Sequence, residues 1–110
     1  MSVDNGICLY SIEKDGCLNG VYSNEYAKGK VFNEIAYKHP QAEELGNGIF
    51  SRYNGYYFDP KGTPAEINIS IDSRKGQYIF EWIVDRILTF KGYGYLMNST
   101  QLVVWYESVP

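Results

Sequence analysis

The amino-acid sequence predicts an all-β protein, a single antiparallel up-and-down β-barrel of about eight strands that spans residues 1–110. Apolar and polar residues alternate with the period of a strand, most clearly in Ile67–Ile71 and Tyr78–Trp82. Short segments rich in Gly, Asp and Asn separate such runs, and no segment predicts a helix longer than one or two turns. Consecutive strands joined by short turns close most simply into a barrel, because closure removes the unpaired sheet edges. An open β-sandwich is the alternative.

Five strands are expected before the central hairpin, at Ile7–Glu13, Cys17–Ser23, Lys30–Lys38, Ile49–Phe58 and Thr63–Asp72. The Asp15-Gly16 pair predicts a hairpin between the first two strands. Residues 39–48 contain a proline and a Gly-Asn-Gly segment, and they predict a surface loop with one helical turn at Gln41–Leu45. A turn at Asp59–Gly62 joins the last two of these strands, which makes Gly55 a bulge or a barrel corner.

The central hairpin carries an aromatic seam. If Ser73–Gly76 form a four-residue loop, Asp72 faces Gln77. The opposing pairs are then Ile71 with Tyr78, Ile69 with Phe80 and Ile67 with Trp82.

The expected pairing of the strand that follows Asp85 with the central hairpin accounts for Gly92 and Gly94. A three-residue loop that begins at Asp85 places Gly92 opposite Phe80 and Gly94 opposite Tyr78, so that both glycines leave room for the rings. After a turn at residues 98–100, the strand Gln101–Glu107 alternates, with Leu102, Val104 and Tyr106 inward and Val103 and Trp105 outward.

Composition excludes several classes of function. The net charge is −3 and the ten basic residues are scattered, so we expect no nucleic-acid partner. No apolar run approaches the roughly 20 residues of a membrane span, and the N-terminus lacks a basic and apolar leader, so we expect no membrane association and a cytoplasmic location. Cys8 and Cys17 do not lie opposite each other across the first hairpin, which predicts free thiols.

No catalytic or metal-binding set can be assembled from the sequence. His39 is the single histidine and neither cysteine has a partner nearby, so we expect no enzyme activity, metal or cofactor. The third strand does bring one polar side chain inward, either Asn33 or Glu34, depending on which face is buried. We expect Glu34 to face solvent and Asn33 to face inward.

Two functions remain. The first is a non-enzymatic barrel that holds a small apolar or mixed ligand, with candidate binding residues Tyr22, Asn24, Asn33, Tyr78, Phe80, Trp82 and Tyr106. The second is a protein-interaction domain, such as an inhibitor, immunity protein or accessory subunit, or a homo-oligomer. Its candidate interface is an outer aromatic face made of Tyr93, Tyr95, Val103 and Trp105.

Several segments resemble small calycin-type barrels of the avidin and lipocalin kind. Leu18–Asn24 with the following Gly29 resembles the opening strand of the avidin family, and Tyr78–Trp82, Phe90–Gly92 and Leu102–Trp105 resemble its later strands. The resemblance covers about half of the chain and implies biotin or a similar small ligand, held by Asn24 and the two tryptophans. Tyr22 stands where that family has tryptophan, and Gly29-Lys30 where it has Gly-Ser, so we expect a ligand other than biotin.

Overall fold

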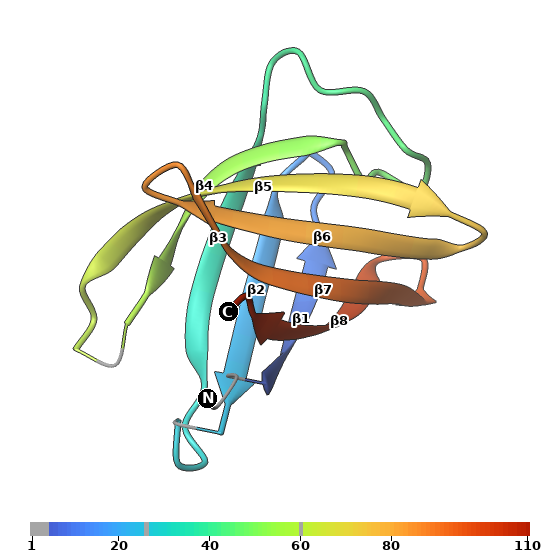
Figure 1. The fold of residues 1–110 in the computed structure, drawn as a ribbon. Coiled ribbons are helices and arrows are strands. Elements are labelled where there is room, and N and C mark those ends of the chain that lie inside the picture. The colour runs from blue at the N-terminus through green and yellow to red at the C-terminus, as the bar shows by residue number, and fades with distance from the viewer. Residues whose placement is uncertain (1–4, 26, 60) are drawn as a thin grey trace.

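The computed structural model describes residues 5–25, 27–59 and 61–110, and these form a closed barrel of eight antiparallel strands (Figure 1). The strands are β1 (Asn5–Ile12), β2 (Leu18–Asn24), β3 (Phe32–Lys38), β4 (Arg52–Phe58), β5 (Pro64–Arg74), β6 (Gln77–Val84), β7 (Ile87–Asn98) and β8 (Gln101–Ser108). Each strand pairs with the next, and β8 pairs with β1. The prediction of an up-and-down barrel is therefore confirmed, and the open sandwich is excluded. The described part of the chain contains no helix long and apolar enough to span a membrane.

Strand alternation divides the side chains into an inner and an outer set. The inner set is almost entirely apolar, and its largest fully buried members are Tyr10, Tyr53 and Phe80. Three inner rings pack in series: Tyr10 of β1 stacks on Phe80 of β6 at 5.7 Å between centroids, and Phe80 stacks on Trp82 of the same strand at 5.2 Å. Such pairs add to the stabilisation from burial alone. The predicted aromatic seam therefore forms the central layer of the core.

The β5–β6 hairpin is tighter than predicted. Lys75 and Gly76 alone form the turn, both with positive φ (51° and 82°), which matches the twist of the flanking strands. The predicted four-residue loop is therefore wrong, and the register moves by two residues: Ile71 lies opposite Phe80, and Ile69 opposite Trp82. A shift of two residues keeps every side chain on its predicted face, because the side-chain period of a strand is two.

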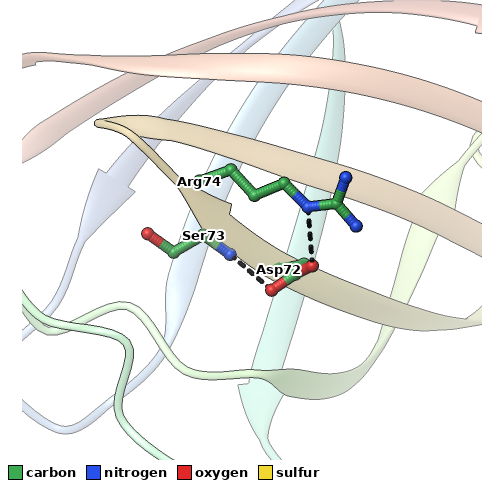
Figure 2. Close-up of polar contacts among 3 residues, drawn as sticks. All are labelled: Asp72, Ser73 and Arg74. Carbon is green, nitrogen blue, oxygen red and sulfur yellow. Dashed lines mark hydrogen bonds and ion pairs between the residues drawn. The ribbon is translucent and has the colours of Figure 1, made fainter.

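The end of β5 is fixed by local polar contacts. Asp72 accepts a hydrogen bond from the Ser73 amide at 2.9 Å and from the Arg74 Nε at 3.3 Å (Figure 2). The Arg74 and Asp72 side chains are both well exposed. A pair in this setting contributes little to stability, because water screens it.

The β6–β7 pairing confirms the predicted partners of both glycines, Gly92 opposite Phe80 and Gly94 opposite Tyr78. The predicted three-residue loop is wrong, since a two-residue turn at Asp85 and Arg86 combines with an irregularity after Trp82 to give the same register. A Cβ atom at Gly92 would approach the Trp105 carbonyl oxygen of β8 to 2.6 Å and the Trp82 ring to 2.9 Å. On β6, Gly92 therefore makes room for Trp82, its diagonal neighbour, rather than for Phe80, which it faces directly.

The β3–β4 loop arches over one end of the barrel (Figure 1). Ile49 is fully buried beneath it, and the Leu45 amide donates to the Ile49 carbonyl at 2.7 Å. Asn47 Nδ2 donates to the Tyr78 hydroxyl at 3.1 Å, which ties the loop to the core. The loop has no helical turn at residues 41–45, and β4 starts only at Arg52, so both expectations for this region are corrected. This end of the barrel is closed.

The β4–β5 turn lies at the opposite end of the barrel. The Gly62 amide donates to the Asp59 carbonyl at 2.8 Å, which agrees with the predicted turn, although Pro60 lies outside the described residues. Gly55 pairs in unbroken register with both Ala36 and Ile67, so the predicted bulge is wrong. A side chain there would instead collide with the Ile35 carbonyl of β3.

Candidate ligand cavity

The barrel is hollow at the end opposite the β3–β4 loop, where a cavity of about 280 Å³ lies among the inward side chains. The cavity is bordered by the segment after β2, the β4–β5 turn, and the early part of β7. Aromatic side chains provide most of its wall: Tyr22, Phe32, Tyr57, Trp82, Phe90 and Tyr106. The closed end is packed and the open end is lined by rings, so any small molecule inside this barrel would occupy the open end.

Glu34 is the buried carboxyl of the cavity. It lies in the middle of β3, opposite Gly20 of β2 and Tyr57 of β4, and its side chain is only 8% exposed. The Tyr10 hydroxyl donates a hydrogen bond to Glu34 Oε2, and Trp82 Nε1 donates to the Tyr10 hydroxyl at 3.3 Å. Three strands therefore contribute to one buried polar network, which fixes the direction of the carboxyl group.

Burial dominates the electrostatics of this network. Loss of hydration raises the pKa of Glu34 to about 7, although the hydrogen bond from Tyr10 opposes the rise. The same loss of hydration raises the pKa of the Cys8 thiol and the Tyr10 hydroxyl well above their ordinary values. Near neutral pH, the Glu34 carboxyl group therefore titrates, whereas Cys8 and Tyr10 keep their protons.

Part-buried polar groups lie nearer the open end. The Tyr22 hydroxyl donates to the Phe58 carbonyl at 2.7 Å, which ties the end of β2 to the end of β4. Asn24 Nδ2 donates to the Tyr106 hydroxyl at 3.4 Å. Asp59, in the β4–β5 turn, also lines the cavity and is partly exposed. The cavity therefore combines an apolar wall with a small number of fixed polar groups, as ligand pockets in proteins usually do.

Four of the predicted binding residues line this cavity, namely Tyr22, Asn24, Trp82 and Tyr106. Tyr78 and Phe80 are buried in the core and do not line the cavity. Asn33 is exposed on the outside of β3, whereas Glu34 is inside, so the expected faces of this strand are reversed. The partners of β3 explain the reversal, because the buried residues Leu18 and Gly20 of β2 lie opposite Ala36 and Glu34.

Besides Glu34, sequence reasoning missed seven lining residues that lie on several strands and turns: Cys8, Ala27, Phe32, Tyr57, Asp59, Ile67 and Phe90. The inward position of Glu34 could have been predicted from the pairing of β2 with β3. This pairing, across the turn at Gly29, places Glu34 on the same face of the sheet as Leu18. The apolar Ile35 and Tyr37 obscured this signal, because they make the outer face of β3 look like a core face.

The outer aromatic face lies on β7 and β8, as predicted. Tyr93 is paired with Trp105 and Tyr95 with Val103 across the two strands. Tyr93, Tyr95 and Trp105 are 50%, 46% and 52% exposed, respectively, and the rings of Tyr95 and Trp105 lie 6.3 Å apart. Their outward orientation is confirmed, while their role in binding another chain stays a prediction.

Metal and thiol chemistry have little support in the described residues. Within residues 5–25, 27–59 and 61–110, no three His, Cys, Asp or Glu side chains are placed to hold a metal ion. Cys8 and Cys17 are free thiols, as predicted from their positions.

Comparison with known proteins finds no matching family model, no matching curated protein and no matching solved structure. The resemblance to avidin-like and lipocalin-like barrels therefore stays a prediction.

Proposed function

We propose that this protein binds a small, largely apolar ligand without chemical conversion, inside the open end of the barrel. The observation that carries the proposal is the cavity of about 280 Å³ between six aromatic side chains, opposite an end that the β3–β4 loop closes. Pockets of this kind, apolar with a few convergent polar groups, are the usual binding sites for small molecules. The lining also includes Asn24 and Trp82, two of the three residues that the resemblance to avidin-like barrels implies, whereas the third, Trp105, lies on the outer face.

The volume limits the size of the ligand. Since one water molecule takes up about 30 Å³ of liquid, the cavity has room for about nine waters, and thus for a ligand of roughly ten non-hydrogen atoms. One ring with a short substituent fits this volume. Larger lipids and biotin-sized molecules would project through the open end.

Binding without catalysis is supported by the state of the nucleophile in the cavity. Cys8 is the only thiol of the described lining, and burial raises its pKa well above 9, so it stays protonated and unreactive near neutral pH. His39 lies in the loop at the closed end, where its Nδ1 accepts a hydrogen bond from the Gln41 amide. Free thiols also suit a reducing compartment, so we place the protein in the cytoplasm.

A fluorescence titration tests the proposal. The sequence has two tryptophans, of which Trp82 lines the cavity and Trp105 is on the outer face. The variant Trp105→Phe therefore leaves a single reporter inside the barrel. Small aromatic compounds should change Trp82 emission with saturation. Ala27→Phe, which adds a ring to the buried wall of the cavity, should abolish that change.

Val31→Phe provides the matched control, because it adds the same side chain at an exposed position. It should leave the titration unchanged. A panel of single-ring compounds that gives no saturable change in Trp82 emission, or one that Ala27→Phe does not affect, would refute binding in the cavity.

A second candidate function is contact with another protein chain through the outer aromatic face. Three half-exposed rings on two adjacent strands are the observation that favours it, since such patches are typical of interfaces. The mass measured by light scattering should fall when Trp105→Ser is introduced, if the face joins two copies. Tyr56→Ser, at a similarly exposed ring on β4, is the control and should not change the mass.

A further inference from the structure

The charges of the cavity lining have one sign. Glu34 and Asp59 both contribute carboxyl groups, and no lysine, arginine or histidine lines the cavity in the described part of the chain. An anionic ligand would therefore meet carboxylates without any opposite charge. A purely apolar ligand would cover Glu34 and shut it away from water without offering it a partner, which is unfavourable.

The rings of the lining stand at steep angles to one another. The Trp82 and Tyr106 rings are 5.7 Å apart and inclined by 59°, and Phe90 meets Tyr106 at 88°. Across the cavity lining, Tyr22 and Tyr57 meet at 80°. Rings in such an arrangement cannot all stack on one flat ligand. They line the cavity at several inclinations instead, a set of rings called the aromatic box below, and the electron-rich faces of aromatic rings attract cations.

Glu34 supplies a buried carboxyl group beside the aromatic box. Tyr10 holds its carboxyl group from the core side by a hydrogen bond to Oε2, and Trp82 contributes both to this network and to the box. Two causes disfavour the ionised form of this carboxylate: Glu34 is buried, and no basic side chain of the described lining lies beside it. A positively charged ligand would remove the second cause.

We propose that the ligand of this cavity is an organic cation, a small ammonium compound whose charged group lies between the aromatic rings and the Glu34 carboxylate. This inference rests on the proposed binding function and specifies its ligand. The size estimate of roughly ten non-hydrogen atoms fits a single ring that carries an amine or a methylated ammonium group.

The proposal implies that binding releases a proton. Glu34 is largely protonated below pH 7 in the empty barrel, and it must ionise to pair with the cation. The other titratable groups that face it are Cys8, Tyr10, Tyr22 and Tyr57, with Asp59 at the turn. Burial raises the pKa of the thiol and of all three hydroxyls, so these groups do not titrate between pH 6 and pH 8. Affinity for a cation should therefore fall about fivefold from pH 7 to pH 6 and by nearly tenfold over the next pH unit.

The test compares two probes of the same shape. Phenyltrimethylammonium carries a fixed positive charge, whereas tert-butylbenzene is its uncharged counterpart. In the Trp105→Phe background at pH 8, we expect the cation to bind at least tenfold more tightly than the uncharged probe. Glu34→Gln, which keeps the shape of the side chain, should weaken cation binding by tenfold or more and leave tert-butylbenzene within about twofold. Glu66→Gln, which removes a carboxylate from the exposed face of β5, should change neither.

The outcomes separate this inference from the proposed function. If tert-butylbenzene binds in the cavity as tightly as the cation, or if Glu34→Gln weakens both equally, the cation proposal is overturned while small-ligand binding stands. If neither probe binds up to millimolar concentration and no other single-ring compound changes Trp82 emission, both fail. The unmodified protein provides an independent check, since its affinity for the cation, but not for tert-butylbenzene, should fall about fivefold from pH 7 to pH 6.

Discussion

Replacing the buried carboxyl of Glu34 by an amide should remove a pH dependence from the stability of the barrel. Burial raises the pKa of Glu34 from the ordinary 4.5 to about 7. A group whose pKa is raised in the fold contributes stability below its unfolded pKa and loses it as the pH rises towards the folded value. The native protein should therefore lose stability between about pH 4.5 and pH 7, and no further above that.

The magnitude follows from the same two pKa values. A rise from 4.5 to about 7 corresponds to about 3 kcal/mol at full ionisation. Between pH 5.5 and pH 8.5, within the range where denaturation is convenient to measure, linkage gives a loss of about 2 kcal/mol. Glu34→Gln lacks this titration, so its unfolding free energy should rise relative to the native protein by that amount over the same interval.

Urea unfolding followed by tryptophan fluorescence at pH 5.5, 7.0 and 8.5 measures this difference directly. Glu66→Gln is the control, because it removes a carboxylate that lies exposed on β5, and its profile should run parallel to that of the native protein. Profiles of Glu34→Gln and the native protein that stay parallel within about 0.5 kcal/mol would refute the reasoning. Such a result would mean that water reaches Glu34 in the fold and that its pKa is not raised.

Three further substitutions test other parts of the account. Tyr10→Phe removes the hydrogen bond to Glu34, so the carboxyl pKa should rise above 7 in a ¹³C NMR titration; a lower value would contradict the assigned donor. Gly92→Ala should cost about 1–3 kcal/mol in urea unfolding and Gly94→Ala less, because only the first places its Cβ within 3 Å of a backbone carbonyl; equal costs would contradict this packing. Arg86→Gly should be about 1 kcal/mol more stable than Arg86→Ala, since φ is +66° there; equal stability would contradict the left-handed turn.

The architecture was predictable because several independent signals agree on it. Alternation in β6 to β8, turn residues at each junction and small residues opposite large rings all require antiparallel neighbours. The lengths of the turns were less accessible. Lys75-Gly76 and Asp85-Arg86 form two-residue turns in which all four residues have positive φ, and three of the four are not glycine, the residue that adopts this conformation most readily. Tertiary pairing imposes that conformation, and local propensity does not reveal it.

The cavity was predictable in part. The aromatic residues Tyr22, Trp82 and Tyr106 could be placed inside from their own strands. Glu34 could not be placed from its own strand, because a charged residue is usually assigned to solvent; only the pairing of β3 with β2, which puts Glu34 on the same face as Leu18, overrides this preference. Asn33 was assigned inward for the same reason. The burial of Glu34 and its hydrogen bond from Tyr10 can thus be recognised only when the pairing of β1, β2 and β3 is known.

The central claim, that a small molecule binds inside the open end of the barrel, is tested most directly by the two indole N–H signals in a ¹⁵N NMR spectrum. Trp82 lies in the cavity wall and Trp105 lies on the outer face, so each signal reports one of the two surfaces. Titration with phenyltrimethylammonium and with tert-butylbenzene should move the Trp82 signal to saturation and leave Trp105 in place. Movement of Trp105 alone, or of neither signal, would contradict the claim.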